Sequence, residues 1–229
     1  MNKKGGNMIK AVVLDVDGTL FDTENLDVIA YGEVGKRYGY DITKEILTKA
    51  IGMNHEDSAK CISSHFDENF NFSKIVKEAD EYKKEYMQLN GIPLKKGARE
   101  LLDFLQEKEY KIGVATSTRR NLTEERFDQV GFMPYFDEIV CGDDLEKGKP
   151  NPEIYLKACE KLEVKPEEAV AIEDSKNGIL AAESAGMQVI MVPDLVEPTE
   201  ELLTHVDVKL PDLLEVILWL KNREKNVRR

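Results

Sequence analysis

The sequence predicts an α/β protein: a parallel sheet with helices on both faces, plus an inserted all-helical domain. Three observations predict it. Short apolar runs rich in β-branched residues recur along the chain, helical stretches separate most of them, and one long segment contains helices without a convincing strand. Because alternating strands and helices are joined by right-handed crossovers, they build a parallel sheet that is covered on both faces.

The expected strands are short buried runs, and the expected helices between them begin or end at typical signals such as an early proline or a following glycine. The strands are expected at 9–14, 111–115, 138–141, 169–172, 189–192 and 206–208. The helices between them are expected at 97–108, 121–130, 152–162 and 177–185.

Residues 22–91 interrupt this alternation. Four helical stretches are expected there, at 25–38, 43–50, 56–65 and 73–89. We therefore predict three parts: a Rossmann-like core formed by 8–21 and 92–220, a helical cap formed by 22–91, and flexible ends at 1–7 and 221–229.

Composition narrows the functional classes. The 229 residues carry 44 Asp and Glu against 32 Lys and Arg, a formal charge of −12, which argues against nucleic acid as a partner because phosphate backbones are held by clustered Lys and Arg. No apolar run is long enough to span a membrane. The three cysteines are widely spaced and form no C-x-x-C pair, so neither a zinc site nor a disulfide framework is expected, and a cytoplasmic location fits. The sequence leaves the oligomeric state open, and a monomer is compatible with it.

Polar residues follow four of the expected strands. Since the carboxyl ends of parallel strands meet at one edge, where ligands bind in such sheets, these residues are expected to converge. They are Asp15 and Asp17 after the first strand, Thr116 and Ser117 after the second, Lys149 beyond the third, and Glu173 and Asp174 after the fourth.

Asp15 and Asp17 are two residues apart, so in extended backbone their side chains face the same side. Two close carboxylates raise the proton affinity of one of them, which suits a nucleophile paired with a proton donor. Gly18 allows the tight turn that follows. A plain polar turn is the alternative. The pattern D-x-D-G also occurs in calcium loops, but the spacing of an EF-hand is not met here.

The other strand-end residues suggest a metal and a phosphate. Glu173 and Asp174 could join Asp15 and a backbone carbonyl near Asp17 on a hard cation, and oxygen ligands with water suit Mg²⁺. The alternative is a cap for the helix that follows, which Asp174 or Ser175 could provide. Thr116 and the amides after it lie at a helix N-terminus that could hold phosphate or merely be capped, and Lys149 could equally be a solvated lysine.

Taken together, four separated segments resemble the four motifs of the haloacid dehalogenase superfamily. They are 12–19, 114–117, 148–150 and 172–175, and they occur in the family's order. The segment at 22–91 is similar to the small helical cap of the branch that holds β-phosphoglucomutase and phosphoglycolate-type phosphatases.

The resemblance implies a role for each residue. Asp15 would attack phosphorus and form an aspartyl-phosphate, and Asp17 would protonate the leaving oxygen and then activate water. Thr116, Ser117 and Lys149 would hold the phosphoryl group, with Lys149 also steadying Asp15. The second acid, Asp17, favours phosphate chemistry, because the dehalogenases proper lack it.

The resemblance also implies Mg²⁺ as cofactor. Its ligands would be Asp15, the carbonyl of Asp17 and Asp174, with Glu173 a ligand either directly or through water. The expected function is a Mg²⁺-dependent phosphatase that hydrolyses a small phosphorylated metabolite, such as a sugar phosphate.

Two alternatives stay open. One is a mutase of the β-phosphoglucomutase type, but the sugar mutase carries His where this chain has Asp27, Arg where it has His55, and tends toward Val where it has Thr19. The other is a phospho-accepting signalling module, which would not need so large a helical lid. In the cap, the loop with Gly52, Asn54 and His55 is expected either to face the substrate or to be a plain turn between helices.

Overall fold

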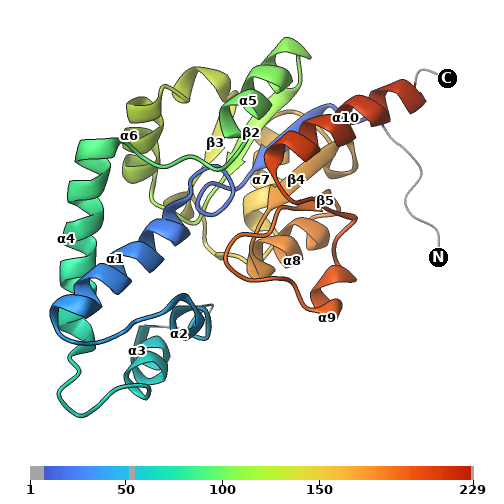
Figure 1. Cartoon of the computed structure of the whole chain (residues 1–229). Helices are drawn as coiled ribbons and strands as arrows, with labels where there is room; N and C mark the ends of the chain where they lie inside the picture. The colour runs from blue at the N-terminus through green and yellow to red at the C-terminus, as the bar shows by residue number, and fades with distance from the viewer. Residues whose placement is uncertain (1–7, 52–54, 228–229) are drawn as a thin grey trace. The chain divides into compact units, whose positions relative to one another are not determined.

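The computed structural model describes residues 8–51 and 55–227, and it divides the chain into two compact units (Figure 1). The helical unit is Asp22–Pro93, and the α/β unit is formed by the chain before and after it. The chain therefore completes one strand, builds the whole helical unit, and then returns to finish the sheet.

Six parallel strands form the sheet in the part of the chain that the structure describes. Their order is β3-β2-β1-β4-β5-β6, so β1 lies between β2 and β4. Their bounds are β1 Ala11–Leu14, β2 Lys111–Ala115, β3 Glu138–Val140, β4 Ala169–Glu173, β5 Gln188–Met191 and β6 Val208–Lys209. Strands β2 and β3 are added on one side of β1, and β4, β5 and β6 are added on the other. Open α/β sheets bind ligands at such a change, which here lies between β1 and β4.

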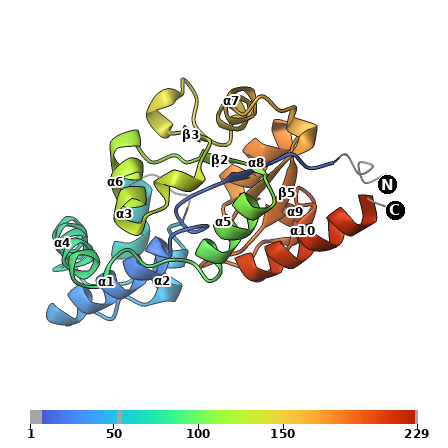
Figure 2. The same ribbon diagram turned by 90° about the horizontal axis from the view of Figure 1, so that it is seen from above.

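Helices cover both faces of this sheet (Figure 2). Helices α7 and α8 pack on one face, and α5 packs on the other together with α10. The α7/α8 face carries small side chains, such as Ala11 and Ala171, which let these helices approach closely. The helices are α5 Ala98–Glu107, α6 Arg120–Val130, α7 Glu153–Lys161, α8 Lys176–Ser184, α9 Glu200–Leu203 and α10 Leu213–Val227, with 3-10 turns at Met133–Tyr135, Gly142–Asp144 and Pro166–Glu168.

The helical unit has a core of its own, in which Ala30 and Val34 of one helix pack with Ile75 and Ala79 of another. Its helices are α1 Thr23–Arg37, α2 Lys44–Thr48, α3 His55–Ser63 and α4 Phe72–Asn90. The predicted fold class, a parallel α/β sheet with an inserted helical region, is therefore confirmed. Among the described residues, no helix is both long and apolar enough to cross a membrane.

The C-terminal helix α10 is the main element that was not predicted from the sequence. It runs to Val227, through the segment expected to be a loose end. Leu213, Val216, Ile217 and Leu220 are buried, and their spacing of three, one and three is that of a helix with one apolar face. The signal was therefore present in the sequence.

Gly97 offers a test of how tightly α5 and α10 fit together. Its φ is +87°, and a Cβ there would lie 2.8 Å from the backbone nitrogen of Leu214. We expect Gly97→Ala to cost about 1–2 kcal/mol for the left-handed conformation. Overpacking adds about 1–3 kcal/mol. The measurement is the free energy of unfolding in urea.

Gly131→Ala is the matched control, because Gly131 has φ +70° but nothing within 4 Å of an added Cβ. It should show only the conformational cost. Equal losses in the two variants would contradict the close approach of α5 and α10.

Candidate active site

Strand register brings three neighbouring strands together around one lysine. Leu14 of β1 pairs with Val114 of β2 and with Ile172 of β4, so the next residues along, Asp15, Ala115 and Glu173, are adjacent. The Nζ of Lys149 donates to all three: to Asp15 Oδ1 at 2.6 Å, to Glu173 Oε1 at 2.6 Å and to the Ala115 carbonyl at 2.9 Å. Lys149 therefore uses its three protons to tie the ends of β1, β2 and β4 together.

Glu173 is fully buried, and both of its carboxylate oxygens accept hydrogen bonds. Besides Lys149, Oε1 accepts from the Tyr155 hydroxyl at 2.8 Å. Oε2 accepts from the amides of Asp174 and Ser175 and from the Ser175 hydroxyl, at 3.2, 3.1 and 3.0 Å. Five donors meet a group that has about four lone-pair sites, so Glu173 is held firmly in place.

Asp174 completes a cluster of carboxylates with Asp15 and Glu173. Each of the three offers one oxygen, and these oxygens lie within 4.8 Å of one another. The turn after β1 reaches this cluster: Thr19 donates to Asp174 Oδ1 at 3.2 Å, and Gly18 has φ +84° with no room for a Cβ beside the Asp174 carboxylate. Ser175, rather than Asp174, caps α8 by accepting from the Gly178 amide at 3.1 Å.

Burial and crowding perturb the charges in this cluster. The pKa of Asp15 is raised to about 7: burial, the largest cause, and the Glu173 carboxylate raise it, whereas the Lys149 ammonium lowers it. Burial, followed by the Asp15 carboxylate, raises the pKa of Asp174 well above its ordinary range. Burial disfavours the charged form of Lys149, but Asp15 and Glu173 outweigh it and raise the pKa of its ammonium.

These groups fit a divalent cation. When all three carboxylates are ionised, the ammonium of Lys149, which pairs with Asp15 and Glu173, leaves an excess of two negative charges at a site with little access to water. A doubly charged ion would remove that excess, and clustered carboxylate oxygens are the donors that hard cations take.

The predicted phosphate-binding residues lie on the loop after β2. Thr116 is buried, and its Oγ1 accepts from the Thr118 amide at 3.1 Å. Ser117 is exposed, and its carbonyl lies so close to Gly142 that no Cβ would fit there. Helix α6 starts at Arg120, whose guanidinium donates to Asp144 at 2.5 Å and so ties this loop to the loop after β3.

Asp17 does not join the carboxylate cluster with its side chain. Arg126 Nη1 donates to Asp17 Oδ1 at 2.8 Å, and the Thr118 hydroxyl donates to Oδ2 at 2.7 Å. From the sequence, Asp15 and Asp17 were expected on the same side, with their proximity raising the proton affinity of one of them. In the structure Asp17 is the smallest of the influences on Asp15, and burial is the largest.

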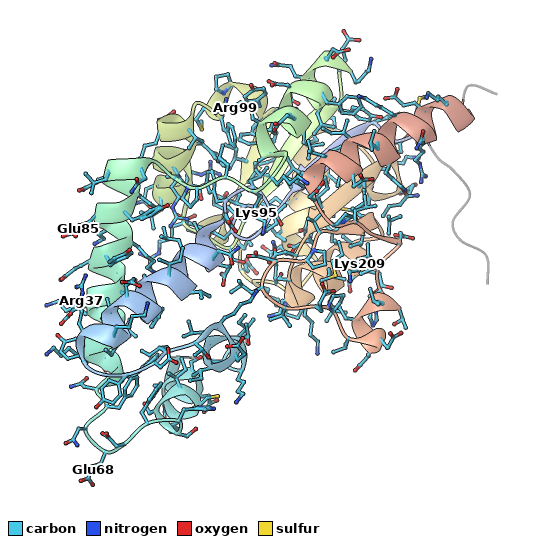
Figure 3. All side chains as sticks on the ribbon, viewed as in Figure 1. Arg37, Glu68, Glu85, Lys95, Arg99 and Lys209 are labelled. Atoms are coloured by element: carbon cyan, nitrogen blue, oxygen red, sulfur yellow. The ribbon has the colours of Figure 1, made fainter. Side chains whose placement is uncertain are left out.

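Three contributing residues, Asp194, Tyr155 and Arg126, were missed from the sequence, and Thr118 was expected to contribute its amide rather than its hydroxyl. Asp194 follows β5 at the same sheet edge, where it raises the pKa of Asp174 and accepts from Lys95 at 2.6 Å (Lys95 is labelled in Figure 3). The strand-end rule could have found it. Tyr155 and Arg126 lie within helices, and no sequence motif indicates which residues their side chains contact. The same holds for the contact that the Thr118 hydroxyl makes.

The structure gives no side-chain contacts for the three residues that were expected to face the substrate from the cap. Gly52 and Asn54 lie outside the described residues, and His55 is described only as the first residue of α3.

Comparison with known proteins identifies the family. A family model for haloacid dehalogenase-like hydrolases matches residues 12–192, which run from the second residue of β1 to just beyond β5 and contain all of the clustered residues. The chain belongs to this family. The predicted membership and the predicted enzyme class, a phosphatase of the haloacid dehalogenase type, are both confirmed.

Several relatives in this family resemble the chain over most of its length. A phosphorylated carbohydrates phosphatase from Thermotoga maritima is 38% identical over 183 residues, or 79% of this chain and 83% of the relative. A validoxylamine A 7'-phosphate phosphatase from Streptomyces hygroscopicus subsp. limoneus is 32% identical and covers 91% of this chain and 96% of its own. A crystal structure of a proposed β-phosphoglucomutase from Thermotoga maritima superimposes with a TM-score of 0.77 at 32% identity, covering 93% of this chain and 99% of the other.

Crowding of carboxylates predicts that Asp174→Asn stabilises the metal-free protein. At about pH 8 the raised pKa makes ionised Asp174 unfavourable in the folded state, so we expect a gain of about 1–2 kcal/mol in the free energy of unfolding in EDTA. At about pH 5 folded Asp174 is largely protonated, so the gain shrinks. Excess Mg²⁺ should reverse the order, because it stabilises the wild type by mass action.

Glu167→Gln is the control, since it removes an exposed carboxylate. If Asp174→Asn were less stable than the wild type at about pH 8 in EDTA, the crowding of the carboxylates would be contradicted. If Mg²⁺ stabilised Asp174→Asn as much as the wild type, the metal site would be contradicted.

Proposed function

We propose that the protein is a Mg²⁺-dependent phosphatase that hydrolyses a small phosphorylated metabolite through an aspartyl-phosphate at Asp15. The contact that carries this proposal is that between Lys149 and Asp15. It holds a buried carboxylate in one orientation at the sheet edge where ligands bind, with a positive charge beside it.

The reaction then follows in two displacements. A carboxylate oxygen of Asp15 attacks phosphorus, the ester P–O bond breaks, and the leaving oxygen takes a proton from Asp17. A water molecule next attacks the aspartyl-phosphate and gives its proton to Asp17, so that the bond to Asp15 breaks and inorganic phosphate leaves. Splitting one displacement into two lowers each barrier, and Asp17 serves both as acid and as base.

The remaining residues neutralise and orient the phosphoryl group. Thr116, Ser117 and Lys149 are the proposed donors to its oxygens. Mg²⁺, when bound, would neutralise charge on the phosphoryl oxygens. Asp15, Asp174 and the Asp17 carbonyl would hold it. We propose that Glu173 positions Lys149 instead of ligating directly, because its oxygens already accept from five donors.

A mutase of the β-phosphoglucomutase type is the second candidate, since one structural relative carries that proposed activity. Within the helical unit, Asp27 accepts from Lys83 at 2.5 Å, and Lys83 also contacts Asp80 at 2.9 Å. Asp27 is thus committed to an ion pair where the sugar mutase has a histidine. Thr19 likewise serves Asp174. These contacts favour the phosphatase.

We further propose that the helical unit selects the organic part of the substrate, with Gly52, Asn54 and His55 as the specificity residues. A relative named for phosphorylated carbohydrates supports sugar phosphates as the first class to screen.

The test is turnover of p-nitrophenyl phosphate and of a panel of sugar phosphates, with Mg²⁺ and with EDTA. We expect steady release of phosphate that requires Mg²⁺. Asp15→Asn should lose it by at least about 10⁴-fold, because the nucleophile is gone. Asp143→Asn, at an exposed carboxylate of the neighbouring loop, is the control.

The two other candidates give different results. A single stoichiometric labelling of Asp15 without turnover would indicate a phospho-accepting signalling module. Formation of glucose 6-phosphate from β-glucose 1-phosphate and its bisphosphate, in place of free phosphate, would indicate the mutase.

A further inference from the structure

Both oxygens of the Asp17 carboxylate are held by side chains from the segment after β2. Arg126 donates to Oδ1 at 2.8 Å and Thr118 donates to Oδ2 at 2.7 Å. Two donors on two different oxygens fix the plane of the carboxylate as well as its position.

The helix that carries Arg126 is itself fixed against the loop that carries Asp17. Phe127, the next residue of α6, is fully buried, and its ring lies 5.7 Å from that of Phe21 and 4.6 Å from that of Phe136. Phe21 in turn forms a backbone bridge with Asp17. Arg126 therefore acts from a rigid support, so its contact with Asp17 has a defined geometry.

Stability alone gives little reason for this contact. The side chains of Arg126 and Asp17 are 27% and 30% exposed, and partly solvated ion pairs contribute little to folding. The orientation of Asp17 is what the pair determines.

We propose that Arg126 is a positioning residue for the reaction, which holds Asp17 in the orientation from which it exchanges a proton with the leaving oxygen. This inference rests on the proposed phosphatase function and assigns a role to a residue outside the four family motifs.

The two donors also differ in what they permit. A guanidinium can only donate, whereas a hydroxyl can donate or accept. Oδ1 therefore remains an acceptor throughout. Oδ2 is the oxygen that can carry the transferable proton, because the Thr118 hydroxyl, which donates to Oδ2 when the carboxylate is ionised, can turn its hydrogen away when Oδ2 is protonated. As the ester P–O bond breaks, its electron pair stays on the leaving oxygen and the proton on Oδ2 moves to that oxygen.

The test compares two substrates whose leaving groups differ in their need for a proton. p-Nitrophenolate leaves as a stable anion, whereas the alkoxide of a sugar phosphate needs the acid. We expect Arg126→Met to lower kcat/KM for the best sugar phosphate by about tenfold or more. For p-nitrophenyl phosphate the change should stay within about threefold. Arg126→Lys, which keeps one donor, should recover part of the loss and provides a folded variant if Arg126→Met is unstable.

A double-mutant cycle shows whether Arg126 acts through Asp17. In the Asp17→Asn background Arg126→Met should cause no further loss with the sugar phosphate, because the group that it positions is already gone. Lys161→Met is the control for net charge, since Lys161 forms a partly exposed ion pair with Glu138, at 3.5 Å.

Equal losses with both substrates, no loss with the sugar phosphate, or additive losses in the cycle would each overturn the positioning role. Failure of the proposed function is distinguishable, because the wild type would then release no phosphate from either substrate.

Discussion

One buried ammonium, that of Lys149, is the interaction on which the rest of the site depends. Its three protons reach the carbonyl of Ala115 and the carboxylates of Asp15 and Glu173, and these three residues end adjacent strands. A lysine can satisfy them together only if β2, β1 and β4 are in this register. The pairing of these strands therefore also fixes the orientation of Asp15, the proposed nucleophile.

This arrangement keeps an unfavourable charge state in place. The protein carries a net charge of −12, and its catalytic edge adds buried carboxylates that burial pushes toward their neutral forms. A phosphate dianion would be repelled by such a site, so local cations have to reverse the field there. Lys149 supplies one fixed positive charge. The negative charge of the carboxylates that it leaves unbalanced is the physical reason to expect that a divalent cation binds there.

The fold could be predicted because the buried strands stand out in the sequence, and the central site residues could be predicted because they follow the ends of those strands. Asp15, Lys149 and Asp174 lie directly after or near buried strands, and the parallel arrangement of those strands brings the three residues to one edge of the sheet. Arg126 and Tyr155 could not be found in this way. Each lies inside a helix, and which partner it meets depends on how that helix packs, as Phe127 shows for α6. Asp194 followed the same rule as the predicted residues and was overlooked.

Glu173 shows how packing decides between two roles that the sequence left open. A Cβ on Gly178 would overlap its carboxylate, so α8 begins in direct contact with it, and Tyr155 closes the other side. A carboxylate enclosed by a helix start, a tyrosine and a lysine has little freedom to turn toward an ion. Asp174, one residue further along, lies outside this enclosure and faces the turn at Thr19. This difference in enclosure is the physical basis for the proposal that Glu173 orients the lysine and that Asp174 ligates the metal ion.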